Sequence, residues 1–222
     1  MNKHHHQEEH HLGHDDDHVH GNAFVVPFFL ILAFATIEYS GGIFTNSLAL
    51  IGDAGHMLSD ALALGLAWLA SHHASNFATT KHVSGLSYFE LAASIINCLV
   101  MLGITIYIVL EALDRLNYSQ HVTGFYVMVL AMIGVAVNLI VAKMLHQHGD
   151  EHGGKDNLNH RAAFLHVLGD LLASVAALVA GAMIYFTGWL LADPILSLFI
   201  SALILIGTLN LAKDIWLTLK KG

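Results

Sequence analysis

Six long apolar stretches constrain this chain more than any other feature of its sequence. Each is about 20 residues or longer, the length that a helix needs to cross about 30 Å of hydrocarbon. Charged residues make up only 12% of the 222 residues, against about 25% in a typical soluble domain. We therefore expect an all-α, multi-pass integral membrane protein with six transmembrane helices, at residues 23–44, 47–71, 87–113, 123–145, 158–187 and 192–213.

Two polar segments are rich in histidine, acidic residues and glycine. They cover residues 1–22 and 146–160, and their composition cannot form a core but can bind metal loosely. We interpret them as a cytoplasmic tail and a cytoplasmic loop of a transmembrane domain spanning residues 23–218. Both would raise the metal concentration at the cytoplasmic face. A solvated, disordered linker is the alternative interpretation for both.

The basic residues indicate the orientation in the membrane. If both termini are cytoplasmic, every Lys and Arg except Arg115 faces the cytoplasm, as the positive-inside rule requires.

Isolated polar residues inside the apolar segments have simpler interpretations. Asn138 is expected to form a hydrogen bond between helices. Glu38 either lines a pathway or reaches the membrane interface, and Glu90 lies near a cytoplasmic end. Asp193 and Pro194 predict the start of the last helix, with Asp193 as N-cap and Pro194 at the first helical position.

Two of the apolar segments carry ionisable residues at the same spacing. His56 and Asp60 are four residues apart, so they share one face of a helix. His166 and Asp170 repeat this His-x-x-x-Asp pattern in the fifth segment. Ionisable groups are costly inside a membrane and indicate a functional site. If the two helices face each other, two imidazoles and two carboxylates converge.

This ligand set indicates a metal site. Two nitrogens and two oxygens suit a tetrahedral ion such as Zn²⁺, with Cd²⁺, Co²⁺ and Ni²⁺ as further candidates, whereas Ca²⁺ and Mg²⁺ prefer more oxygens. Asp53 precedes His56 by three residues. It either binds the metal, supports the ligands from outside the site, or lines the ion pathway. His72, His73 and His82 are candidates for a smaller accessory metal site, with an ordinary solvated loop as the alternative.

The stretches SLALIGDAGHMLSDALAL, RAAFLHVLGDLLASV and ADPILSL resemble the cation diffusion facilitator family of zinc transporters. Weaker matches are Glu38 in TIEYSGG, Glu90 followed by LAA with Asn97, and Glu111, and the resemblance covers about residues 24–217. It implies a homodimer in the lipid bilayer, in the cell (inner) membrane, that exports divalent metal from the cytoplasm in exchange for protons. It also implies the transport ligands His56, Asp60, His166 and Asp170.

Two departures from the family pattern stand out. Members usually carry a basic residue just before the glutamate that opens the third helix, where this chain has Tyr88 and Phe89. Members also usually continue into a cytoplasmic metal-binding domain, whereas this sequence ends at Gly222. We therefore expect a form without the C-terminal domain, either naturally short or truncated, in which helices or loops hold any dimer.

The predicted function is proton-coupled efflux of divalent metal by alternating access. All four ligands titrate, and they must lose protons to hold metal, so protons on the far side compete for the same site. A membrane protein that binds or senses zinc without moving it is the main alternative, and a channel is another. An enzyme is disfavoured because catalytic zinc keeps three protein ligands and an open position. Nothing indicates a nucleic acid or a small organic substrate.

Overall fold

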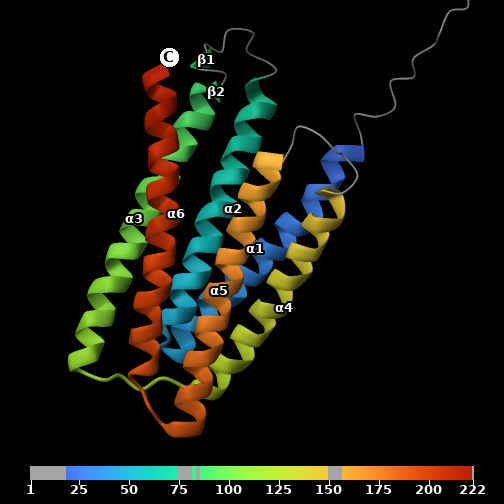
Figure 1. Ribbon diagram of the computed structural model, residues 1–222. Helices are drawn as coiled ribbons and strands as arrows, with labels where there is room; N and C mark the ends of the chain where they lie inside the picture. The colour runs from blue at the N-terminus through green and yellow to red at the C-terminus, as the bar shows by residue number, and fades with distance from the viewer. Residues whose placement is uncertain (1–18, 75–81, 84–85, 150–156, 222) are drawn as a thin grey trace, which may run out of the picture.

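The computed structural model describes residues 19–74, 82–83, 86–149 and 157–221. Within them, six helices occupy the positions of the six apolar stretches (Figure 1). A short antiparallel hairpin between the second and third helices is an addition to the predicted all-α fold. The elements are α1 (Val19–Thr45), α2 (Leu48–Ala74), β1 (His82–Val83), β2 (Leu86–Ser87), α3 (Tyr88–Asn117), α4 (Gly124–Gly149), α5 (Asn157–Thr187) and α6 (Ala192–Lys221).

Most of the helices are longer than hydropathy predicted. α1 begins within the predicted tail, α4 and α5 extend into the predicted loop 146–160, and α6 continues past residues 213 and 218. Hydropathy marks the part of a helix that crosses lipid, whereas the backbone hydrogen bonds continue into the polar residues beyond it. Residues 1–18 and 150–156, which hold most of the predicted tail and part of the predicted loop, lie outside the described residues.

Five of the helices are long and apolar enough to cross a membrane, at Phe28–Thr45, Leu91–Asn117, Gly124–Lys143, Val167–Thr187 and Ala192–Lys220. Among the residues described, α2 does not meet this criterion, so six spans stay a prediction. α2 contains Asp53, His56 and Asp60 and packs against α1, α3, α5 and α6. A helix with neighbours on several sides needs less apolar surface than a helix that faces lipid.

The helices run up and down, so that alternate connections meet at one end of the bundle. Figure 1 shows the start of α1 and the end of α6 at one end, which we call the terminal end. The connections at residues 46–47, 118–123 and 188–191 lie at the opposite end, which we call the turn end. The two ends of the described chain therefore share a side, and the assignment of that side to the cytoplasm stays a prediction.

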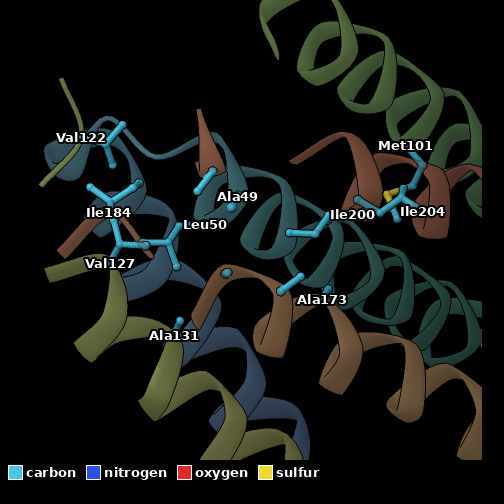
Figure 2. Packing of buried hydrophobic residues seen from close by; sticks show 13 residues of the cluster. Ala49, Leu50, Met101, Val122, Val127, Ala131, Ala173, Ile184, Ile200 and Ile204 are labelled. Atoms are coloured by element: carbon cyan, nitrogen blue, oxygen red, sulfur yellow. The ribbon is translucent and has the colours of Figure 1, made fainter. Parts of the chain in front are cut away.

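Small and branched apolar side chains fill the main core between the helices. Figure 2 shows Leu50, Val127 and Ile184 close together in one part of this core. Met101, Ile200 and Ile204 meet in another part, between α3 and α6. In lipid the packing of such side chains, rather than release of water, holds helices together.

Asp193 has a different role from the one predicted. It lies inside α6, which begins at Ala192, and its carboxylate bonds to the start of α2. Oδ2 accepts a hydrogen bond from the Leu48 amide at 2.8 Å, and Oδ1 accepts one from the Ala49 amide at 3.3 Å and one from Ser47 Oγ at 2.5 Å. Asp193 therefore caps α2 instead of its own helix, and it joins α2 to α6 at the turn end.

Arg115 lies at the same end, and its side chain is buried. Its guanidinium donates to the backbone oxygen of Asn46 at 2.6 Å, to Asn46 Oδ1 at 2.9 Å and to Glu111 Oε1 at 2.9 Å. Its Nη1 lies 4.0 Å from Asp193 Oδ2. Arg115 therefore connects α3 to the α1–α2 turn and to the carboxylate that caps α2.

Gly181 permits close contact between α5 and α4. A Cβ at this position would lie 2.5 Å from the Met128 nitrogen and 2.9 Å from the Met128 Cα, so Gly181→Ala would push two backbones apart. We expect a loss of about 1–3 kcal/mol in stability, measured as a lower thermal transition of the purified protein in detergent. Gly207→Ala is the matched control because its Cβ would meet nothing within 4 Å. Equal transitions for the two variants would contradict this account of the packing.

Candidate metal centre

Three of the four predicted ligands have described side chains, and these three lie together. His56 Nε2 is 3.3 Å from Asp170 Oδ1, across the contact between α2 and α5, and 3.7 Å from Asp60 Oδ2 on its own helix. The side chains are 16% exposed for His56, 22% for Asp60 and 14% for Asp170. The predicted facing of the second and fifth segments is therefore present in the fold.

His166 lies one helical turn before Asp170 in α5. Its side chain is outside the described residues, so the predicted fourth ligand stays a prediction. Among the side chains that are described, no group of three or more His, Cys, Asp or Glu has the geometry of a metal site. The helical spacing explains why α5 can contribute two ligands: residues four apart on a helix project from one face.

Asn97 of α3 holds Asp60, a contact that the motif spacing did not predict. Asn97 Nδ2 donates to Asp60 Oδ1 at 3.1 Å, and Asn97 Oδ1 accepts a hydrogen bond from Ser59 Oγ at 2.6 Å. One carboxylate oxygen of Asp60 is thereby turned toward α3, which leaves Oδ2 on the side of His56. The sequence signal for this role was an amide inside an apolar segment, which marks a position but not a partner.

Asp53 lies one turn of α2 closer to the turn end and is fully buried. Its Oδ2 accepts a hydrogen bond from Ser174 Oγ at 2.7 Å, and Ser174 Oγ in turn accepts one from Asn138 Nδ2 at 3.0 Å. The predicted interhelical role of Asn138 is therefore confirmed. Ser174 lies one turn after Asp170 on α5, so Asp53 adjoins the group formed by His56, Asp60 and Asp170.

Glu38 of α1 is also fully buried, so its carboxylate does not reach the membrane interface. Neither of its oxygens has a hydrogen-bond partner among the described residues. Its carboxyl interacts electrostatically with those of Asp53 and Asp170. Of the two interpretations of Glu38, only a position inside the bundle agrees with this burial.

Three histidines belong to the predicted accessory metal site. His72 and His73 lie near the end of α2 and His82 lies in β1, but their side chains are outside the described residues, as is that of Glu90. The accessory site therefore stays a prediction.

The sequence matches known proteins over nearly its whole length. The profile of the cation efflux transmembrane domain matches residues 24–219. A cadmium, cobalt and zinc/H⁺–K⁺ antiporter of Bacillus velezensis is 37% identical over 206 residues, 91% of this chain and 65% of the relative. The zinc transporter ZitB of Escherichia coli is 43% identical over 181 residues, 82% of this chain and 56% of the relative.

A third relative widens the range of bacteria represented. The metal cation efflux system protein CzcD of Cupriavidus metallidurans is 37% identical over 204 residues, which is 91% of this chain and 63% of the relative. The chain therefore spans between 56% and 65% of the length of these three relatives.

Proposed function

This chain belongs to the cation diffusion facilitator family, and we propose that it exports divalent metal, zinc first, in exchange for protons. The proposed transport site consists of His56, Asp60, His166 and Asp170. The main support is the closeness of His56 Nε2 to carboxylates of two helices, at 3.3 Å from Asp170 and 3.7 Å from Asp60. The names of the relatives, which include zinc transporters and a cadmium, cobalt and zinc/H⁺–K⁺ antiporter, agree with this proposal.

The chemistry of the four residues favours zinc and ions similar to it. Two imidazole nitrogens and two carboxylate oxygens can form a tetrahedral site, and the two negative charges neutralise a divalent ion in a low-dielectric interior. Cd²⁺, Co²⁺ and Ni²⁺ bind similar ligands with overlapping strength. Asn97 would keep Asp60 oriented, since hydrogen bonds from residues around a metal site fix the orientation of its ligands.

Exchange with protons follows from the titration of the ligands. Metal binds only when the imidazoles are neutral and the carboxylates ionised, and imidazole titrates near pH 6.5. A site that faces the cytoplasm would take up metal at neutral pH. When rocking of the helices exposes the site to the other side, protons there compete for the same lone pairs and release the metal.

The proposed assembly is a homodimer with both termini in the cytoplasm.

Zinc flux in proteoliposomes tests the function. The full chain is reconstituted, and transport of Zn²⁺ is followed with an internal fluorescent indicator while a pH gradient opposes the metal gradient. We expect accumulation of Zn²⁺ against its own gradient, abolished by nigericin, and competition by Cd²⁺, Co²⁺ and Ni²⁺. Zinc binding without flux would instead favour the binding or sensor protein, and flux independent of pH would favour a channel.

A further inference from the structure

Two buried carboxyl groups lie beside the proposed transport site and are not among its four proposed ligands. Glu38 of α1 and Asp53 of α2 lie within the helical bundle, and both have 0% exposure. Glu38 precedes the end of α1 by seven residues and Asp53 follows the start of α2 by five. At about 1.5 Å per residue, both residues lie roughly 10 Å from the turn end along their helices. The pair therefore lies between the turn end and His56.

Structural hydrogen bonds do not explain this pair. Asp53 Oδ2 accepts a hydrogen bond from Ser174 Oγ at 2.7 Å. Asp53 Oδ1 and both oxygens of Glu38 have no hydrogen-bond partner within the described part of the chain. Two buried carboxylates without a compensating cation are strongly unfavourable. A proton or another cation bound by the pair would offset this cost.

We propose that Glu38 and Asp53 form a second cation site, for the ion that crosses in exchange for the divalent metal. The proposal rests on the function proposed above. The donors are all oxygens: two carboxyl groups and the Ser174 hydroxyl. Oxygen-only sites favour hard cations over zinc-like ions, which gain from imidazole nitrogen. The ligand is therefore a hard monovalent cation, either a proton or an alkali metal ion such as K⁺.

The position of the pair couples it to the transport site. The Glu38 carboxyl interacts electrostatically with Asp170, and Asp53 interacts with both Asp170 and His56. Among the described side chains, these are the titratable groups of α2 and α5 that adjoin the pair, while α4 contributes the neutral Asn138. In a low-dielectric interior, positive charge in one site opposes positive charge in the other. Occupation by the counter-cation would thereby weaken metal binding, which is the requirement for exchange.

Separate measurements of exchange and of coupling test the proposal. Full-length wild type, Glu38→Gln and Asp53→Asn are reconstituted in liposomes, and ⁶⁵Zn²⁺–Zn²⁺ exchange is measured without any other gradient. Gradient-driven Zn²⁺ accumulation is then measured in two arms: a pH gradient at equal K⁺, and a K⁺ gradient at equal pH. The arm that drives the wild type identifies the counter-cation. Asp214→Asn, which alters an exposed carboxyl of α6, is the control.

We expect both variants to keep Zn²⁺–Zn²⁺ exchange and to lose gradient-driven accumulation by about five- to 150-fold, the usual range of coupling between two sites. The control should keep both activities. Accumulation at the wild-type level in both variants, or loss of exchange together with accumulation, would overturn the proposal. If the wild type itself neither exchanges nor accumulates Zn²⁺, the proposed function fails instead.

Folding is checked by thermal unfolding of each purified variant. Neutral amides are cheaper to bury than uncompensated carboxylates, so both variants should unfold at or above the wild-type temperature. The amide oxygen in Asp53→Asn can still accept the hydrogen bond from Ser174. Failure of both variants to fold would show that the charges are structural, and this too would contradict a cation site.

Discussion

Asp170→Ala should reduce the initial rate of zinc transport by more than about 100-fold. Asp170 supplies the carboxylate that lies 3.3 Å from His56 Nε2 across the contact between α2 and α5. Its removal would leave three ligands and one negative charge fewer for a divalent ion. Loss of a residue that hydrogen-bonds a ligand already lowers metal affinity or activity about 10- to 100-fold, so loss of a ligand should lower them more. The measurement is Zn²⁺ flux into proteoliposomes with an opposing pH gradient.

Asp214→Asn is the matched control for this prediction. It alters a carboxyl that is exposed and far along α6 from the proposed site, so the rate should match the wild type. Asp170→Asn keeps the size of the side chain and removes its charge, and it should resemble the alanine variant. A folded Asp170→Ala protein with wild-type flux would remove this residue from the transport site.

Asp193→Ala should lower the free energy of unfolding by about 3–5 kcal/mol, the usual cost of removing one partner from a buried ion pair. The substitution leaves the Leu48 and Ala49 amides without their acceptor and leaves Arg115 without a carboxylate 4.0 Å away. The expected fall in Tm is about 6–20 °C for a chain of this length. Thermal unfolding in detergent, followed by size-exclusion chromatography, measures it.

Asp193→Asn separates the two contributions. The amide oxygen can still accept a hydrogen bond from the Leu48 amide, but the charge opposite Arg115 is lost, so the fall in Tm should be smaller than for alanine. A wild-type Tm for Asp193→Ala would mean that the contacts at the turn end do not stabilise the fold.

The spacing of the candidate ligands could be predicted because it is a property of nearby residues in the sequence. The spacing alone places His56 and Asp60 on one face of their helix, and it places His166 and Asp170 on one face of theirs. The prediction assumed that α2 and α5 face each other, and the fold has this arrangement. The contact from Asn97 to Asp60 was not predictable, because an amide inside an apolar segment does not reveal which helix it meets.

The amino-acid sequence alone determined the number, order and approximate positions of the helices, because apolar length and helical spacing are properties of contiguous residues. Only the tertiary structure decided that Asp193 caps α2 rather than α6 and that Arg115 is buried beside it. It also decided that Glu38 and Asp53 share one interior layer. These outcomes depend on how helices distant in sequence pack, and a polar group in a low-dielectric interior bonds to whichever partner that packing brings within reach.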